Sequence, residues 1–281
     1  MRTLPLALAP VALGTGIGVL EGGDRPWSPV NALLCLVVAL ALQVGVNFAN
    51  DYSDGVRGTD RFRVGPARLT GSGAAAPKRV LAVALAFFAI AALAGLALTV
   101  LTATWWLLAV GVLSLAAAWF YTGGRRPYGY YGLGEVVVFV FFGLVATIGS
   151  AWAQSGIAVS ALELLGGSAL GSFACAVLVA NNLRDREQDA LAGKRTLAVL
   201  IGPVASRVLF CVLMLVPYLL LVPLTLIAPG TAFVYFTLLL ALPTVAVGGW
   251  ARSARELILA LQLASLTSLS YGLGLGVLLA L

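Results

Sequence analysis

The chain has 281 residues, of which 61% are hydrophobic and only 10% are charged, whereas about a quarter of the residues in a soluble domain are charged, so a water-soluble globule is excluded. Histidine is absent, which excludes histidine-ligated zinc, a histidine ligand to haem iron, and Ser-His or Cys-His nucleophile pairs. The formal net charge of +6 suits either nucleic-acid binding or the basic loops of a membrane protein, and the placement of the charges decides between them.

Apolar runs long enough to cross a bilayer follow one another along the whole chain. They lie at residues 4–20, 29–49, 79–101, 104–121, 133–152, 161–181, 207–227, 231–250 and 257–280. Because a spanning helix needs about 20 apolar residues, we expect an all-α, polytopic membrane bundle of nine transmembrane helices, forming one domain over residues 1–281. We expect the first run to be a retained span rather than a signal peptide, because no small-residue cleavage site is evident.

The basic residues predict the orientation of these spans. If the N-terminus lies inside, the connections after the second, fourth, sixth and eighth runs also lie inside, and sixteen of the 17 Arg and Lys residues fall on that side. Only Arg25 falls outside. Because basic loops stay in the cytoplasm, we expect a multi-pass protein of the cytoplasmic membrane whose charged loops, and any site they form, face the cytoplasm. Topology thus accounts for the charge, and we expect no nucleic-acid partner.

Two of the inner loops, residues 50–79 and 182–202, are rich in acids. They hold six of the 11 Asp and Glu residues, namely Asp51, Asp54, Asp60, Asp185, Glu187 and Asp189. They also share a spacing, since Asn50-x-x-x-Asp54-x-x-x-Gly58 is matched by Asp185-x-x-x-Asp189-x-x-x-Gly193. Each copy lies at the inner end of an even-numbered span, which predicts two related four-helix halves with a ninth helix appended.

Residues four apart share one face of a helix, so the polar side chains of each motif project together. Carboxylate and amide oxygens at this spacing suit Mg²⁺, which binds through one or two carboxylates and completes its shell with water and substrate phosphate oxygens. We therefore expect Mg²⁺ as the cofactor and a diphosphate as the missing ligand. The candidate metal ligands are Asn50, Asp51, Asp54, Asp185 and Asp189.

Basic and amide side chains around these acids can bind phosphate oxygens. The candidate substrate-binding residues in the two loops are Asn50, Arg57, Lys78, Asn182, Lys194 and Arg195. We expect Gly58 and Gly193 to end their helices, and Gly65-Pro66 with Gly71-Ser72-Gly73 to form a mobile lid. A single cluster of acidic and basic residues at a helix end could simply anchor the helix in the membrane–water interface. Two clusters with matched spacing favour a ligand-binding site instead.

Aromatic residues of the fourth and fifth spans offer the apolar half of a binding site. They are Trp105, Trp106, Trp119, Phe120, Tyr121, Phe139, Phe141 and Phe142. Such rings either line a lipid-facing groove, where their faces stabilise a developing cation, or serve as interfacial belts and core packing.

Three blocks of the sequence carry a family resemblance. They are residues 50–60 with 63–66, residues 182–189 with 193–199, and residues 121–135, which contain Tyr121-Thr122-Gly123-Gly124, Pro127-Tyr128-Gly129 and Gly132-Leu133-Gly134-Glu135. The first two resemble the aspartate-rich motifs of the UbiA superfamily of intramembrane prenyltransferases, and the third is similar to the loop between its fourth and fifth helices. More narrowly, the blocks resemble the branch that prenylates 1,4-dihydroxy-2-naphthoate.

The resemblance implies a nine-helix bundle in which Mg²⁺ bridges both acidic motifs to an isoprenyl diphosphate. The implied catalytic residues are Asp54, Asp60, Asp185 and Asp189, with Asp54 or Asp60 as the base. It also implies substrate contacts by Tyr121 and Arg125, although many relatives have Tyr-x-x-x-Lys where this chain has Tyr121-x-x-x-Arg125.

The implied activity is transfer of a polyprenyl group from polyprenyl diphosphate to 1,4-dihydroxy-2-naphthoate, with decarboxylation, in menaquinone synthesis. Other acceptors of the family are 4-hydroxybenzoate, homogentisate, a chlorophyllide or a glycerol ether lipid. A divalent-cation or phosphate transporter is disfavoured because most spans lack ionisable groups near mid-membrane. A lipid-binding scaffold predicts that Asp54→Asn and Asp185→Asn leave function intact. Prenyl length and oligomeric state stay open.

Overall fold

The structure is a computed structural model that describes residues 2–22, 26–59, 65, 68–157 and 159–281. All regular elements of this part are helical, which confirms the expected all-α class. In chain order they are α1 (Pro5–Glu21), α2 (Pro29–Arg57), α3 (Pro77–Thr102), α4 (Trp106–Phe120), the 3₁₀ turn η1 (Tyr128–Tyr131), α5 (Gly134–Val138), the π-helix η2 (Phe139–Val145), α6 (Ala146–Ser155), α7 (Ala161–Leu191), α8 (Leu197–Ile227), the 3₁₀ helix η3 (Pro229–Thr237), α9 (Leu238–Trp250) and α10 (Ala254–Ala280).

Some of these elements follow one another without a break. α5, η2 and α6 form one rod, Gly134–Ser155, and η3 with α9 forms another, Pro229–Trp250. The described residues thus build nine rods, seven of which are long and apolar enough to cross a membrane. The other two, α1 and α4, have 17 and 15 residues. Since a span needs about 20 residues, bilayer crossing by α1 and α4 stays a prediction.

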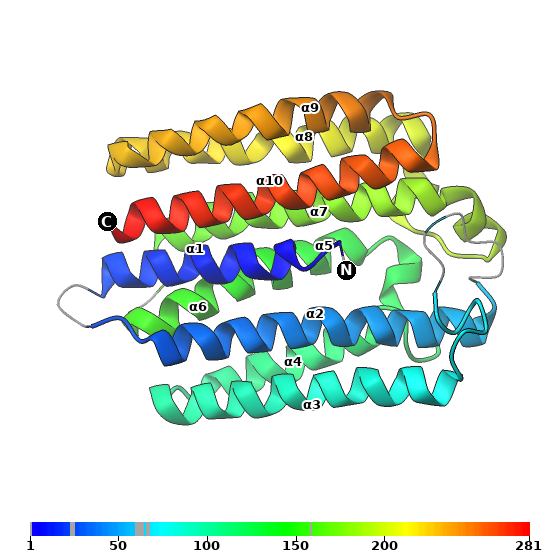
Figure 1. Cartoon of the computed structure of the whole chain (residues 1–281), viewed down its shortest axis with the longest axis horizontal. Helices are drawn as coiled ribbons and strands as arrows, with labels where there is room; N and C mark the ends of the chain where they lie inside the picture. Colours follow the sequence, from blue (N-terminus) through cyan, green and yellow to red (C-terminus); the bar gives the residue numbers. More distant parts are fainter. Residues whose placement is uncertain (1, 23–25, 60–64, 66–67, 158) are drawn as a thin grey trace.

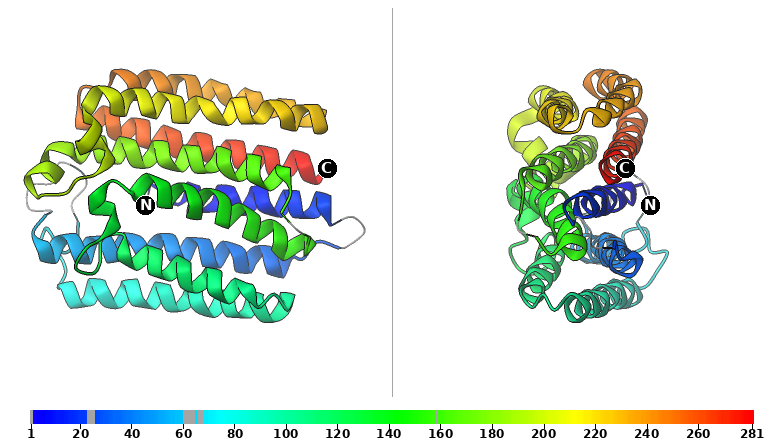
Figure 2. Two further views of the ribbon diagram at one scale, coloured as in Figure 1. Left: turned by 180° about the vertical axis from the view of Figure 1, so that it is seen from behind. Right: turned by 90° about the vertical axis from the view of Figure 1, so that its left-hand side faces the viewer.

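The rods lie side by side in one bundle, and successive connections alternate between its two ends (Figures 1 and 2). The connections after α2, α4, α7 and α9 all lie at the end that is on the right in Figure 1. The charge pattern predicts this grouping, because these are the basic connections. The two acidic motifs therefore lie at the same end of the bundle.

Both acidic motifs are helical rather than looped. α2 continues to Arg57 and α7 to Leu191, well past the apolar runs that predict their spans. Just after them, Gly58 and Gly193 adopt the left-handed conformation, with φ of 75° and 76°, which glycine reaches without steric cost. The predicted helix stops are confirmed at both positions.

The connection after α7 is shorter than expected. α8 begins at Leu197 rather than near residue 207, and its helical geometry is interrupted at Gly202, which has φ 81° and is followed by Pro203. α8 therefore consists of two helical pieces that meet at a kink at Gly202. Asp185 and Asp189 thus lie on the last turns of α7, and a short turn that contains Gly193 leads into α8.

Close contacts between small residues hold the centre of the bundle around α1, α7 and α10. A Cβ added to Gly16 of α1 would lie 2.0 Å from the backbone oxygen of Gly276 on α10, and one on Gly143 would lie 2.6 Å from the Cα of Gly171 on α7. Small residues permit such contacts, which replace the hydrophobic driving force that is missing in lipid. By contrast, no residue of α4 is buried, and a cavity lies beside this helix.

Candidate active site

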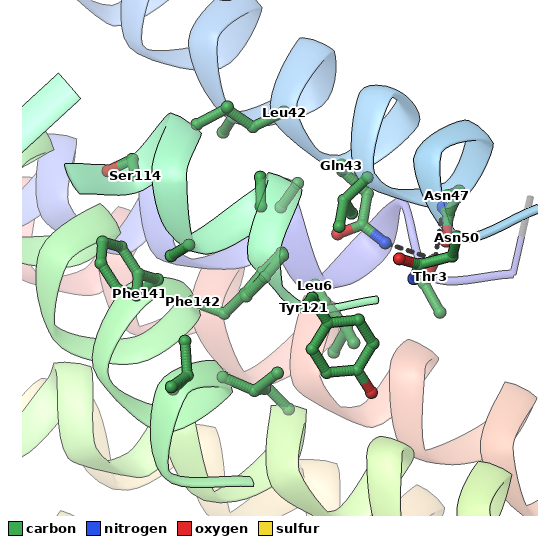
Figure 3. Close-up of a pocket in the computed structure, with 18 of the residues that line it drawn as sticks. Thr3, Leu6, Leu42, Gln43, Asn47, Asn50, Ser114, Tyr121, Phe141 and Phe142 are labelled. Atoms are coloured by element: carbon green, nitrogen blue, oxygen red, sulfur yellow. Dashed lines mark hydrogen bonds between the residues drawn. The ribbon is translucent and has the colours of Figure 1, made fainter. Parts of the chain in front are cut away.

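A cavity of about 870 Å³ is bordered by residues of α1, α2, α3, α4, η2 and α7. At its polar end α2 and α7 contribute Asn50, Asp51, Asp54, Asn182, Asp185 and Asp189, while α3, α4 and η2 form an apolar wall. Figure 3 shows Asn50 and Tyr121 at one side of the cavity and Phe141 and Phe142 at the other. The two acidic motifs, remote in sequence, therefore border one space.

Asp54 is only 2% exposed, and donors from three other segments surround its carboxylate. Arg68 Nη1 and Lys194 Nζ lie 2.7 and 2.9 Å from its Oδ2. The Tyr130 hydroxyl donates to Oδ1 at 2.6 Å. Burial raises the pKa of Tyr130, and the neighbouring Asp54 raises it further, so the phenol keeps the proton that it donates. Two cations and one phenol thus compensate a buried carboxylate.

Lys194 joins the two acidic motifs. Its Nζ lies 2.9 Å from Asp54 Oδ2 on α2 and 3.8 Å from Asp189 Oδ1 on α7. The ammonium also lies 4.8 Å from the ring centroid of Tyr130, a cation–π geometry. Asp54 and Lys194 are 140 positions apart in the chain, so this contact depends on the packing of the whole bundle.

Asp185 is paired with its neighbour on α7. Arg184 donates from Nε to Asp185 Oδ1 at 2.8 Å and from Nη2 to Asn181 Oδ1 at 2.9 Å. Its Nη2 also contacts Asp185 Oδ2, so the guanidinium and the carboxylate form a bidentate ion pair. A Cβ on Gly65 would lie 2.8 Å from this Nη2. The connection after α2 therefore passes directly over Arg184, and glycine allows this approach.

Asn182 is oriented by a buried acid on α5. Its Nδ2 donates to Glu135 Oε1 at 3.0 Å. Glu135 is 7% exposed, and within the described structure its Oε2 has no hydrogen-bond partner. The amide nitrogen of Asn182 therefore faces Glu135. The carbonyl oxygen of Asn182, a cavity-lining residue, consequently points away from Glu135.

Asn50 and Arg57 tie the segment between α4 and η1 to α2. Thr122 Oγ1 donates to Asn50 Oδ1 at 2.7 Å, and the guanidinium of Arg57 donates to the carbonyl oxygens of Thr122 and Gly124. Arg57 is exposed and is not among the described residues that line the cavity. Its geometry indicates a brace for this segment, and the substrate contact expected of it stays a prediction.

Asp51 lines the cavity, but both of its carboxylate oxygens accept bonds from the connection after α2. The backbone N–H of Leu69 donates to Oδ2 at 2.9 Å, and that of Thr70 donates to Oδ1 at 2.8 Å. These bonds hold the connection beside α2, where Arg68 reaches Asp54. Asp51 thus fixes the connection that carries Arg68. Its role as a metal ligand stays a prediction. The mobility of the expected lid also stays a prediction.

Three predicted substrate-binding residues lie away from the cavity. Lys78, Arg125 and Arg195 are exposed and do not belong to the lining that the structure describes. Asp60, a predicted catalytic residue, lies outside the described residues. Tyr121 does line the cavity, in agreement with its expected place.

Sequence reasoning does not single out Arg68, Tyr130 and Glu135 as site residues. Arg68 is one of many basic residues in its loop, and nothing local marks it as the partner of Asp54. Tyr130 and Glu135 lie within the third block, residues 121–135. An acid at the start of an apolar run is the signal that could have identified Glu135, since an ionisable group at membrane depth is a functional candidate.

The polar end fits a divalent cation that is shared with a bound ligand. Asp54, Asp185, Asp189 and the amide of Asn50 line this end and carry oxygen atoms, the donors that hard cations prefer. Among the residues that the structure describes, no three acids lie close enough to hold a metal ion by themselves.

The chain matches the model of the UbiA prenyltransferase family over residues 7–266. It is 47% identical over 272 residues to the 1,4-dihydroxy-2-naphthoate octaprenyltransferase of Mycobacterium tuberculosis, which covers 97% of this chain and 91% of that protein.

Two solved structures share the fold. The apo structure of a UbiA homolog from Aeropyrum pernix K1 superposes with a TM-score of 0.75 at 19% identity, covering 98% of this chain and 97% of that one. A UbiA homolog from Archaeoglobus fulgidus bound to DMAPP and Mg²⁺ gives a TM-score of 0.64 at 16% identity, with the same coverage of 98% and 97%. At these identities the likeness concerns the fold.

Proposed function

The chain belongs to the UbiA prenyltransferase family and is a multi-pass membrane prenyltransferase. We propose that it transfers a polyprenyl group from polyprenyl diphosphate to 1,4-dihydroxy-2-naphthoate, with decarboxylation, in menaquinone biosynthesis. The high identity to a relative that bears the name of this activity supports the naphthoate acceptor.

The observation that carries the proposal is the bridge by Lys194 between Asp54 and Asp189 at the end of a largely apolar cavity. A prenyl diphosphate has the same two halves, a polyanionic head and an apolar tail. The head finds cations at the polar end, and the tail finds aliphatic and aromatic walls.

For the metal we propose Mg²⁺, held by Asn50, Asp54, Asp185 and Asp189 together with diphosphate oxygens. When bound, it neutralises charge on the diphosphate leaving group. The all-oxygen donor set supports this choice, and the Archaeoglobus fulgidus homolog was solved with Mg²⁺ and DMAPP. Lys194 and Arg68, which pair with Asp54 here, are positioned to turn to diphosphate oxygens when the substrate enters.

In the proposed reaction these basic side chains stabilise the charge that develops as the bond between the prenyl carbon and the diphosphate breaks. Tyr121, Phe141 and Phe142 border the same cavity, and their ring faces stabilise the resulting allylic cation. The naphthoate ring attacks this cation through the carbon next to the one that bears the carboxylate. Asp54 or Asp60 takes up the proton from the alkylated carbon, and a proton returns to the neighbouring carbon when its carboxylate leaves as CO₂, which restores the aromatic ring.

We also propose that the whole chain, residues 1–281, acts as one domain in the cytoplasmic membrane, with its polar end facing the cytoplasm. Basic residues of four connections support this orientation, since they gather at the end that holds the acidic motifs.

The test uses the purified protein in lipid nanodiscs with a radiolabelled prenyl diphosphate and Mg²⁺. We expect a prenylated, decarboxylated naphthoate product that disappears when EDTA removes the metal. Parallel reactions offer 4-hydroxybenzoate, homogentisate, a chlorophyllide and a glycerol ether lipid. A product with one of these and none with the naphthoate would replace the proposed acceptor. Mg²⁺ flux into liposomes without any prenyl transfer would overturn the enzymatic function itself.

A further inference from the structure

Three glycines border the apolar part of the cavity, each on a different helix. They are Gly95 on α3, Gly111 on α4 and Gly149 on α6. Glycine inside a helix is less stable than alanine, because it loses more backbone entropy on folding. A reason for its presence is therefore to be sought in the surroundings.

Most glycines at the helix contacts of this bundle have a packing reason that these three lack. A Cβ on Gly16, Gly143 or Gly272 would clash with a neighbouring backbone at less than 3 Å. A Cβ on Gly111 or Gly149 would meet no atom within 4 Å, and one on Gly95 only Val38 Cγ2 at 3.9 Å. None of the three has a left-handed backbone. Neither close helix contact nor backbone conformation requires glycine at these positions.

The missing side chains face the cavity. On α3 the lining comprises positions 91, 92, 95, 96 and 98, which share one side of a helix with Gly95 at their middle. On α4 most residues from 107 to 118 border the cavity, Gly111 among them, and Gly149 lies four residues after the lining residue Val145 on its own rod. A larger side chain at any of the three would occupy cavity space.

The three glycines lie at different depths from the polar end. Gly111 is eleven residues from Thr122, which bonds Asn50, one turn before Asp54, so at 1.5 Å per residue it lies about 22 Å from Asp54. Gly95 lies beside Val38, sixteen residues before Asp54 on α2, or about 24 Å. Asn31 Nδ2 donates to the carbonyl oxygen of Ala153, and Gly149 lies one turn nearer the polar end than Ala153, about 28 Å from Asp54.

We propose that Gly95, Gly111 and Gly149 are specificity-determining residues that set the longest prenyl tail the enzyme accepts. This inference rests on the proposed function, which puts the diphosphate at the polar end and the tail along the apolar wall. The glycines keep a continuous path open from the reacting carbon to the far end of the cavity. The preferred donors are then long-chain polyprenyl diphosphates.

The test replaces each glycine singly by leucine and compares prenyl transfer from dimethylallyl, geranyl, farnesyl, geranylgeranyl and octaprenyl diphosphates to the naphthoate. We expect kcat/KM with dimethylallyl diphosphate to stay within about twofold of the wild type, and that with octaprenyl diphosphate to fall at least about tenfold, since the added side chain excludes a long tail sterically. The loss should begin at a shorter donor for Gly111→Leu than for Gly95→Leu, and only at the longest donor for Gly149→Leu.

Gly274→Leu on α10 is the matched control. Its Cβ would also meet only one atom, Val234 Cγ2 at 3.9 Å, and Gly274 is not among the described residues that line the cavity. This variant should keep the wild-type donor profile. If a leucine variant does not fold, the alanine variant at that glycine adds one methyl group and should show a smaller shift in the same direction.

Donor profiles of the folded variants that coincide with the wild type would overturn the proposal. A wild type that transfers no prenyl group from any donor would instead contradict the proposed function, so the two failures are distinguishable.

Discussion

The ends of α2 and α7 carry the same spacing of polar residues and the same left-handed glycine, yet their contacts differ. Asp54 on α2 is buried at 2% exposure and is contacted by Arg68, Tyr130 and Lys194. Asp185 on α7 is contacted by Arg184, its immediate neighbour. The first end depends on remote segments, whereas the pairing of Asp185 is built largely within its own helix.

This difference indicates how two similar motifs divide the work. A buried carboxylate with several remote partners organises the site, because removing it leaves cations without an anionic partner in a low-dielectric surrounding. The charge of a carboxylate that pairs with the adjacent residue of its own helix is compensated regardless of how that helix packs. Substitutions at the two ends should therefore differ in the size of their effects.

Asp54→Asn has the largest expected effect. The amide keeps the size of the side chain but removes the charge that Arg68 and Lys194 share, so we expect kcat to fall on the order of 10³-fold while the helical fold is retained. Turnover with a radiolabelled donor and circular dichroism measure the two properties. Turnover close to wild type would mean that this end does not organise the site.

Asp185→Asn should lower turnover by about 10²-fold and raise the Mg²⁺ concentration needed for half-maximal activity. The effect is smaller because the partner, Arg184, also bonds Asn181. A Mg²⁺ titration of activity checks it. Glu187→Gln is the matched control, since Glu187 lies on the same helix with a side chain that is 77% exposed. Equal losses in both variants would refute a specific role for Asp185.

Lys194→Met tests the bridge between the two ends. It removes the ammonium that lies between Asp54 and Asp189, and we expect the KM for the prenyl diphosphate to rise about 30-fold, while Lys194→Arg recovers part of the loss. Steady-state kinetics with varied donor separate KM from kcat. Arg195→Gln, at an exposed neighbour outside the cavity, should behave as the wild type. An unchanged KM in Lys194→Met would argue against a diphosphate at this place.

Tyr130→Phe has the smallest expected effect. It removes one hydrogen bond to Asp54 but keeps the ring beside Lys194, so turnover should fall by about tenfold. Because the pKa of Tyr130 is raised above its ordinary value, the phenol stays protonated up to pH values at which a free tyrosine, with a pKa of about 10, loses its proton. Tyr130→Phe and the wild type should therefore share the alkaline limb of the pH profile below pH ~10. A limb that only the wild type shows would contradict this assignment.

Much of the fold and part of the site follow from local patterns. The nine apolar runs coincide with nine helical rods in the described chain, because hydrophobic length is a property of each segment alone. Gly58 and Gly193 end their helices as expected. The roles of Arg57 and Asp51 were not accessible in this way, because their partners lie in loops whose path depends on tertiary packing.

A helical membrane bundle with two polar motifs at one end follows from the chain alone, since apolar length, glycine stops and charge asymmetry act within each segment or across each bilayer face. The bridge by Lys194 between Asp54 and Asp189, and the contacts of Arg68 and Tyr130 with Asp54, come from the packing of the bundle. Those contacts form between segments up to 140 positions apart, and their geometry follows from how closely the helices pack rather than from any local pattern.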